Sequence, residues 1–140
     1  MKKDKIRIVI DTNIWISYLI GKTLSGLSEA IISDKVKILF SSKLFEELIE
    51  VLQRPKFKKY FTNKIIQEFI SLIHSRIEWV EITEYFDDCR DAKDNFLLNL
   101  CVCGKADYLI TGDEDLLVLN PFRKTKIVDY RSFQEVLEEF

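Results

Sequence analysis

Short apolar runs alternate along the chain with longer segments that have apolar residues at helical spacing. The short runs are rich in β-branched and aromatic residues, which favour extended strands. Strands that alternate with helices are typical of a mainly parallel sheet with helices on both faces. We therefore expect one α/β domain over residues 1–140. The predicted strands are 6–10, 36–40, 77–80, 107–110 and 126–128.

The helical segments between these strands have recognisable ends. Pro55 breaks one helix, Thr62 is placed to cap the next, and Gly104 ends a helix that is apolar on nearly all sides and should be buried. In the helix over 43–53, Glu47 lies at the rim of the apolar face, where its carboxylate can point along the edge of the sheet rather than into water. The predicted helical segments are 14–20, 25–33, 43–53, a long one that begins at 62, 94–104, 113–119 and 132–140.

The composition is that of a folded globular protein, with 47% hydrophobic and 31% charged residues. No apolar run has the length needed to span a bilayer, and the basic N-terminus is followed by a strand rather than by a signal-peptide core. These features predict a cytoplasmic protein with no membrane segment. The formal net charge of -2 gives no overall attraction to nucleic acid, so such binding would need a local basic patch.

The chain has three cysteines and one histidine, which limits the available chemistry. An odd number of cysteines without a secretion signal argues against a disulfide framework. A catalytic triad would have to use His74, and a zinc site built from histidines is impossible. Cys101 and Cys103 are poorly placed as a metal pair, because side chains two residues apart on a buried helix do not face each other, and buried thiols are commonly core residues. If there is a metal, acidic side chains must hold it.

Four acids occupy equivalent points, at strand ends or in the first turns of the helices that follow. They are Asp11, Glu47, Asp94 and Asp113. Because the carboxyl ends of parallel strands share one edge of the sheet, these carboxylates should meet there. Carboxylates so close repel one another unless a cation holds them, and oxygen ligands suit Mg²⁺ or Mn²⁺. Such a site can activate water and stabilise the transition state of phosphoryl transfer.

Each acid also has a simpler explanation. Asp11 and Asp113 could serve only to turn the chain or cap a helix, and Glu47 could be a solvated helix residue. Asp91 and Asp94 could form a capping box, which needs no metal. All of these explanations would have to coincide by chance at one sheet edge, so a shared site is the stronger hypothesis.

Five stretches of the chain form a specific set when they occur in this order. They are 9–13 (Val-Ile-Asp-Thr-Asn), 41–48 (Ser-Ser-Lys-Leu-Phe-Glu-Glu-Leu), 54–57 (Arg-Pro-Lys-Phe), 90–97 (Arg-Asp-Ala-Lys-Asp-Asn-Phe-Leu) and 106–117 (Ala-Asp-Tyr-Leu-Ile-Thr-Gly-Asp-Glu-Asp-Leu-Leu). With them the chain resembles PIN domains, a family of metal-dependent nucleases, and most closely the bacterial and archaeal group of toxin components. The resemblance covers nearly the whole chain. It implies a three-layer α/β/α sandwich with a mainly parallel five-stranded sheet.

The resemblance also implies an activity and a set of site residues. The activity is that of a metal-dependent endoribonuclease that hydrolyses single-stranded RNA with one or two Mg²⁺ or Mn²⁺ ions. The biological role implied is the toxin of a type II toxin–antitoxin pair, with an antitoxin protein as partner and a homodimer as the assembly. Carried over by position, the catalytic and metal-binding acids are Asp11, Glu47, Asp94 and Asp113, the secondary acids are Asp91 and Asp115, and the supporting residues are Thr12, Asn13 and Thr111. Cys101 and Cys103 depart from the small residues usual in this helix, which concerns packing more than catalysis.

A basic segment over 54–60 interleaves positive charge with aromatic rings, as proteins that bind single-stranded nucleic acid do. Its cations are Arg54, Lys56, Lys58 and Lys59. The alternative is a solvated helix end whose rings pack inward. A second candidate surface consists of Arg123, Lys124 and Lys126. Trp15 and Trp79 are expected in the core or at an interface rather than stacked on bases.

Two other functions remain open from the sequence. A phosphatase of the haloacid dehalogenase type also begins with a strand that ends in an acid, but it normally has a second acid where this chain has Asn13. A non-catalytic module could keep the same fold and bind a protein partner, although the complete set of acids argues against a decayed site. A pure interaction module has no reason to bind Mg²⁺, so calorimetry of metal binding separates it from a nuclease.

Overall fold

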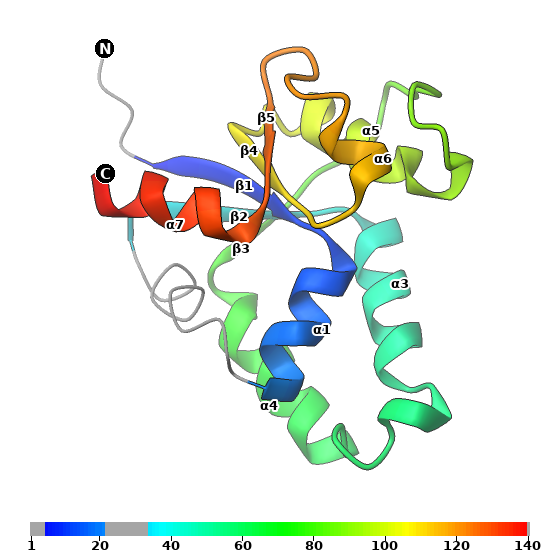
Figure 1. Ribbon diagram of the computed structural model, residues 1–140. Coiled ribbons are helices and arrows are strands. Elements are labelled where there is room, and N and C mark those ends of the chain that lie inside the picture. Colours follow the sequence, from blue (N-terminus) through cyan, green and yellow to red (C-terminus); the bar gives the residue numbers. More distant parts are fainter. Residues whose placement is uncertain (1–4, 22–33, 140) are drawn as a thin grey trace.

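A five-stranded sheet forms the centre of the computed structural model, which describes residues 5–21 and 34–139 (Figure 1). The strands are β1 (Ile6–Ile10), β2 (Val36–Phe40), β3 (Ile77–Trp79), β4 (Tyr108–Ile110) and β5 (Lys126–Val128). They lie in the order β3-β2-β1-β4-β5, and every neighbouring pair is parallel. All five predicted strands are confirmed. The predicted helix over 25–33 lies outside the described residues.

Six α-helices and two 3-10 helices connect the strands in the described part of the chain. The α-helices are α1 (Thr12–Gly21), α3 (Ser42–Leu52), α4 (Asn63–His74), α5 (Asn95–Cys103), α6 (Glu114–Leu117) and α7 (Tyr130–Glu139), and the 3-10 helices are η1 (Pro55–Phe57) and η2 (Ala92–Asp94). Helices α1, α3 and α4 lie on one side of the sheet, and α5 and α6 lie on the other (Figure 1). The strand order explains this, because right-handed crossovers that run in opposite directions along a sheet place their helices on opposite faces. The α/β/α sandwich is thus confirmed.

The central strands and the helix after β1 supply the core. Residues 8–10 of β1 are fully buried, as expected for a parallel strand covered on both faces. Trp15 of α1 is also fully buried, and its ring centroid lies 5.3 Å from that of Phe69 and 6.0 Å from that of Phe40. Trp79, at the end of the edge strand β3, is 51% exposed. Of the two tryptophans, Trp15 therefore belongs to the core and Trp79 to the surface.

Side chains at the helix ends fix where the helices begin and stop. Ser41 and Thr62 each accept a hydrogen bond from the backbone N–H three residues further on, at 3.2 and 3.3 Å, and so cap α3 and α4. Gly104 ends α5, and a Cβ at this position would lie 2.9 Å from both the Leu100 carbonyl oxygen and Leu39 Cδ1. The glycine is needed for this close approach of α5 to β2, since its φ of -88° suits any residue.

Several helix boundaries differ from the predicted ones by one or two residues, and α1 begins at Thr12 rather than at 14. Helix α6 ends at Leu117 rather than at 119, and α7 begins at Tyr130 rather than at 132. The earlier start of α7 has a local cause, because Asp129 Oδ1 accepts a hydrogen bond from the Ser132 N–H at 2.8 Å and satisfies the first turn. No helix within the described ranges has the length and apolar character that crossing a membrane requires.

A half-buried arginine in β1 ties three parts of the fold together. The Arg7 guanidinium reaches past β2 to the Glu78 carboxylate on β3, with Nη1 3.0 Å from Oε1, and its Nε donates to the Gly104 carbonyl oxygen at 2.9 Å. The hydrogen bond from Arg7 holds the pKa of Glu78 below its ordinary value. Periodicity does not predict this pairing, because the partners lie 71 and 97 residues from Arg7 along the chain.

Candidate functional site

The carboxyl ends of β1 and β4 lie side by side and present two buried polar residues. Ile10 pairs with Ile110 in the sheet, so Asp11 and Thr111 follow at the same level. Asp11 is 8% exposed and Thr111 is fully buried. The Thr111 hydroxyl donates a hydrogen bond of 2.6 Å to Asp11 Oδ2, and Thr111 Oγ1 accepts one of 3.0 Å from the Asp113 N–H. Thr111 thus fixes the orientation of Asp11 and the start of the turn that carries Asp113.

Glu47 comes to the same edge from the second turn of α3. Its Oε2 accepts a hydrogen bond of 2.8 Å from the hydroxyl of Thr12 on α1. Because Thr12 directly follows Asp11, this bond brings the Glu47 carboxylate beside Asp11. The side chain of Asn13 is exposed, and its contribution is a backbone hydrogen bond to Asp11. Glu47 is therefore a partner of the strand end rather than a solvated helix residue.

Asp94 lies where η2 meets α5, and its carboxylate makes no helix-capping hydrogen bond. Asp91 caps η2 instead, by accepting a hydrogen bond from the Lys93 N–H at 3.3 Å. The capping box that could have explained Asp94 is therefore not formed. Asp94 Oδ2 is buried and has no hydrogen-bond partner in the described structure. An unpartnered buried carboxylate oxygen is costly, so this position calls for a specific explanation.

Burial and neighbouring negative charges raise the pKa of two of the acids at this edge. Burial, a hydrogen bond with Asp113 and the negative charges of Asp113, Asp11 and Asp91 raise the pKa of Asp94 to about 7. Burial, with smaller contributions from Asp113 and Glu47, raises the pKa of Asp11, against the hydrogen bonds from Thr111 and Asn13. The charges that act on Asp11 and Asp94 show that the four predicted acids lie in one region, as the equivalence of their positions in the sequence indicated.

The four acids have the chemistry of a divalent-cation site, although their side chains do not converge on one point. Within the described ranges, no three His, Cys, Asp or Glu side chains converge in metal-binding geometry. Each of three carboxylates instead turns towards a protein donor, and these donors are Thr111 for Asp11, Thr12 for Glu47 and the Asp115 N–H for Asp113. Carboxylates alone suit Mg²⁺ or Mn²⁺. A cation would also satisfy Asp94 Oδ2 and relieve the repulsion that raises the pKa of Asp94.

Comparison with known proteins places the chain in a family. Residues 7–115, from β1 into α6, match the family model of the PIN domain. The chain belongs to the PIN domain family. It is 32% identical over 148 residues to the uncharacterized protein MJ1680 of Methanocaldococcus jannaschii, across 100% of this chain and 95% of that protein. In structure it resembles PAE2754 from Pyrobaculum aerophilum, with a TM-score of 0.60 at 15% identity over 96% of this chain and 91% of that one, a likeness in fold.

PIN domains are in general nucleases that use divalent metals, and the matched region contains the whole acidic edge of this PIN domain. The two secondary acids at this edge, Asp91 and Asp115, are each paired with a basic side chain. Both oxygens of Asp115 accept hydrogen bonds from Arg90, at 2.9 and 3.2 Å. Asp91 Oδ2 lies 3.6 Å from Lys93 Nζ. The structure thus places Asp91 and Asp115 next to the four central acids, with a cation beside each.

Two asparagines that sequence reasoning missed fasten the loop between β3 and η2 to α5. Asn99 Oδ1 accepts a hydrogen bond of 2.7 Å from the Phe86 N–H, and Asn95 Oδ1 accepts one of 2.9 Å from the Cys89 N–H. Asn99 is 8% exposed. A polar residue inside a helix that is otherwise apolar on nearly all sides was the available signal, because a buried amide requires hydrogen-bond partners.

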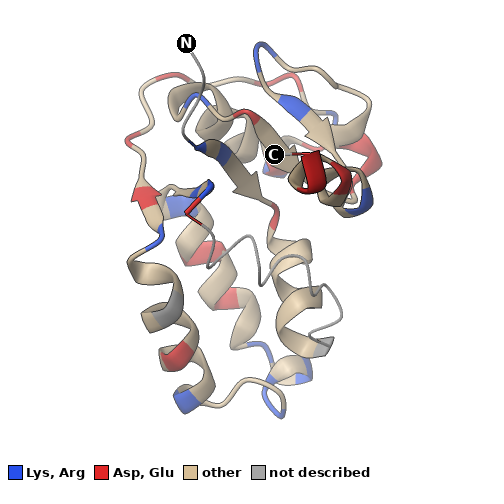
Figure 2. Cartoon of the chain, turned by 90° about the vertical axis from the view of Figure 1, so that its left-hand side faces the viewer, with Lys and Arg blue, Asp and Glu red and all other residues tan. Residues whose placement is uncertain are grey.

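The basic segment lies at the far end of α3 from the acids (Figure 2). Glu47 lies halfway along α3, so seven residues, about 10 Å of helix, separate it from Arg54 at the start of the segment. Lys56 Nζ lies 4.9 Å from the ring centroid of Phe57, and Lys59 Nζ lies 5.0 Å from that of Tyr60. Arg54 pairs with Glu50 on α3 itself. The segment is a surface remote from the central acids, and only a strand several nucleotides long could contact both.

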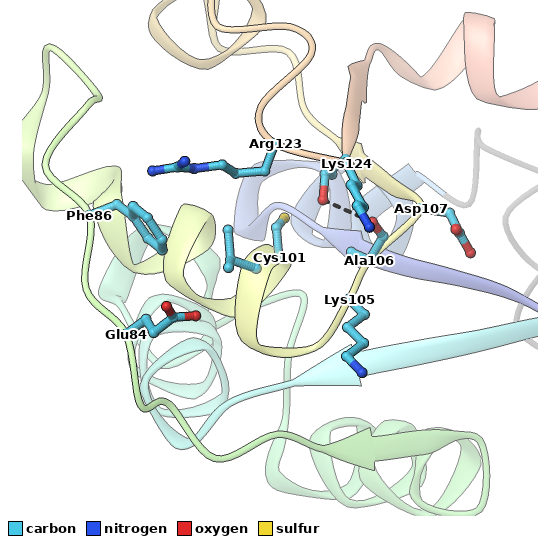
Figure 3. Close-up of a pocket in the computed structure, with 10 residues that line it drawn as sticks. Glu84, Phe86, Cys101, Lys105, Ala106, Asp107, Arg123 and Lys124 are labelled. Atoms are coloured by element: carbon cyan, nitrogen blue, oxygen red, sulfur yellow. Dashed lines mark hydrogen bonds between the residues drawn. The ribbon is translucent and has the colours of Figure 1, made fainter.

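A pocket of about 580 Å³ lies at the opposite edge of the sheet (Figure 3). Asp107, which precedes β4, and Lys124, which precedes β5, help to line it, so it opens at the amino ends of these strands. The Arg123 guanidinium crosses the Phe86 ring at 5.1 Å from its centroid. The second basic candidate surface is therefore separated from Asp11 by the length of the sheet, and none of the predicted acids lines this pocket.

Proposed function

We propose that this PIN domain is a metal-dependent endoribonuclease that hydrolyses single-stranded RNA. The observation that carries the proposal is Asp94 Oδ2, a buried carboxylate oxygen with no hydrogen-bond partner in the described structure, beside other acids of the sheet edge. A buried negative oxygen among like charges is what a cation site requires and what a purely structural turn avoids. Membership of a nuclease family supports the same reading.

The residues that would hold Mg²⁺ or Mn²⁺ are Asp11, Glu47, Asp94 and Asp113. One or two bound ions would supply positive charge to stabilise a phosphoryl transition state and to activate water. The protein's part is to orient the ligands. Thr111 holds Asp11 and Thr12 holds Glu47, each through a short hydrogen bond to one carboxylate oxygen. The second oxygen of each carboxylate stays available to a cation.

A single RNA strand would run from the acidic edge along α3 to the basic segment. Lys56, Lys58 and Lys59 would bind its phosphates there, and Phe57 and Tyr60 offer rings for stacking. The formal net charge of -2 makes a local surface of this kind necessary, because the molecule as a whole does not attract a polyanion.

The proposed biological role is that of the toxin in a type II toxin–antitoxin pair, acting in the cytoplasm. A protein partner, either an antitoxin or a second copy in a homodimer, is part of this proposal. The exposed Trp79 supports such a partner. Its ring centroid lies 5.5 Å from that of the half-buried Phe45 and 6.0 Å from that of the buried Phe40, so an exposed aromatic ring packs on the core at the edge of the sheet. Aromatic residues of this kind are common at protein interfaces.

The test is cleavage of mixed single-stranded RNA by the purified protein with Mg²⁺, with Mn²⁺ and with chelator. We expect metal-dependent cleavage that is lost in Asp94→Asn, while Arg76→Ala retains it, because Arg76 pairs with Asp34 on the surface before β3. Calorimetry of Mn²⁺ binding accompanies the assay. Cleavage by Asp94→Asn at the wild-type rate would refute the assignment, and absence of both metal binding and cleavage would favour a non-catalytic interaction module.

A further inference from the structure

Arg90 extends from the loop before η2, and its guanidinium lies against one carboxylate. Its Nε donates to Asp115 Oδ1 at 2.9 Å and its Nη2 donates to Asp115 Oδ2 at 3.2 Å. The side chain of Arg90 is 85% exposed, whereas that of Asp115 is 24% exposed. Two of the five N–H groups of the guanidinium are thus used, and three remain for a ligand.

The loop that carries Arg90 is anchored on both sides. Asn99 and Asn95 of α5 bind the backbone N–H groups of Phe86 and Cys89, as described above. The thiol of Cys89, which is buried, donates to the Asp115 carbonyl oxygen at 3.7 Å. The backbone next to Arg90 is therefore held to both α5 and α6. Asp115 then fixes the guanidinium itself, so Arg90 is ordered before any ligand binds, which lowers the entropic cost of binding.

A polar hollow of about 320 Å³ adjoins this pair, lined by Arg90, Asp91, Ala92 and Asp115. It lies between the chain segments that carry two of the proposed metal ligands. On one side Asp91 begins η2, which ends at Asp94, and on the other the Asp115 N–H donates to Asp113 Oδ1 at 2.9 Å. The hollow is thus next to the acidic edge.

We propose that this hollow is a phosphate-binding subsite in which Arg90 contacts a phosphate of the RNA strand next to the one that is cleaved. The inference rests on the proposed nuclease function and names a substrate contact for it. An arginine fork matches phosphate geometry, and an acidic edge needs a nearby cation to admit a polyanion. Lys93 offsets the charge of Asp91 at the rim of the hollow, at 3.6 Å.

The same geometry assigns Asp115 a different role from that of Asp113. Both oxygens of Asp115 are occupied by Arg90, so Asp115 is a positioning residue for the guanidinium rather than a metal ligand. Asp113 Oδ1 caps α6, and the side chain also contacts Asp94. Metal binding should therefore depend on Asp113 and not on Asp115, while RNA binding should depend on Asp115 through Arg90.

The first experiment measures RNA affinity without cleavage. Fluorescence anisotropy follows binding of a short fluorescein-labelled single-stranded RNA in EDTA and in Ca²⁺, at several salt concentrations. Loss of a charge-assisted contact should weaken binding by Arg90→Ala about tenfold or more. The slope of log K against log salt should fall by about 0.7, the value for one phosphate contact on a single strand. Arg90→Lys should keep the slope but recover only part of the affinity, and Asp115→Asn should show a smaller loss than Arg90→Ala.

The matched control is Arg76→Ala, which removes an arginine from a surface ion pair with Asp34 at the opposite end of the sheet. It should keep the wild-type affinity and salt slope. The second experiment compares Mn²⁺ binding by calorimetry, where Asp115→Asn should match the wild type and Asp113→Asn should lose affinity. Loss of Mn²⁺ binding by Asp115→Asn equal to that of Asp113→Asn would overturn the positioning role.

The outcomes separate this inference from the nuclease proposal. Binding of RNA that depends on Arg90, without cleavage by the wild type, would keep the subsite and refute the nuclease. Cleavage by the wild type, with affinity, salt slope and KM unchanged in Arg90→Ala, would refute the subsite and keep the nuclease. Failure of the wild type to bind the labelled RNA even at low salt would overturn both.

Discussion

The side chain of Asp113 lies beside that of Asp94 at the edge of the sheet and helps to raise the pKa of Asp94. Two neighbouring carboxyl groups in a partly buried setting favour a state in which one of them carries a proton. Burial, Asp113 and the other negative charges nearby raise the pKa of Asp94 to about 7. A divalent cation between the carboxylates would take the place of the proton. Protonation, metal binding and stability are therefore linked at this site.

The metal-free protein should lose stability as the pH rises from about 4 to about 7. The folded pKa of Asp94, about 7, lies above its ordinary value of 3.8, so between these values the folded state holds a proton that the unfolded state has released. The stabilising contribution is complete below the ordinary value and is lost as the pH rises through 7. Urea unfolding in EDTA at several pH values measures this loss.

Asp94→Asn is the control for this pH dependence, because the amide does not titrate. The difference in unfolding free energy between the wild type and Asp94→Asn should fall steadily between about pH 4 and about pH 7 in EDTA, level off above that range, and change less with saturating Mg²⁺. A difference that stays constant across this pH range would contradict the raised pKa.

Replacement of Thr111 by valine should weaken the site through Asp11. The change removes the hydroxyl that donates to Asp11 Oδ2 and accepts from the Asp113 N–H, both in a buried setting. Loss of these partners should lower the free energy of unfolding by about 1–3 kcal/mol. Mn²⁺ affinity should fall as well, because Asp11 is no longer held. Thr111→Ser keeps the hydroxyl and should recover both properties, and wild-type Mn²⁺ affinity in the valine variant would show that this bond is not needed.

Gly104→Ala should destabilise the fold, whereas Gly112→Ala should not. A Cβ at position 104 would meet the Leu100 carbonyl oxygen and Leu39 Cδ1 at 2.9 Å, so α5 or β2 must shift. Such overpacking costs about 1–3 kcal/mol. A Cβ at position 112 has no neighbour within 4 Å. Denaturant unfolding of both variants gives the comparison. Equal free energies of unfolding would show that α5 and β2 can move apart without loss of stability.

The triple variant K56A/K58A/K59A should bind long single-stranded RNA less tightly and with a smaller salt slope, by about 0.7 for each phosphate contact that is lost. Cleavage of an RNA too short to reach from Glu47 to the basic segment, about 10 Å or more, should stay unchanged, because the lysines lie beyond its reach. The measurement is cleavage rate and anisotropy against RNA length. An equal loss of cleavage for short and long RNA would show that these lysines do not act by binding the distant part of the strand.

Much of the fold was predictable because its signals are local. The five strands, the buried α5 and the caps at Ser41 and Thr62 follow from composition and spacing within a few residues. Ser132, which begins the last helix in the periodic pattern, is preceded in the structure by an extra half turn, because Asp129 caps it. The choice of cap depends on local geometry that hydrophobic spacing does not contain.

By itself the sequence determined the order of the elements and the sheet edge at which Asp11, Glu47, Asp94 and Asp113 meet, because strand ends in a parallel sheet share one edge. Only the tertiary structure decided which acid is left without a partner and which is paired with a cation. Asp94 Oδ2 is unpartnered in the described structure, while Asp115, a secondary acid in the sequence, binds Arg90, 25 residues away. These pairings depend on how loops that are distant in sequence pack together, and residue spacing does not predict that packing.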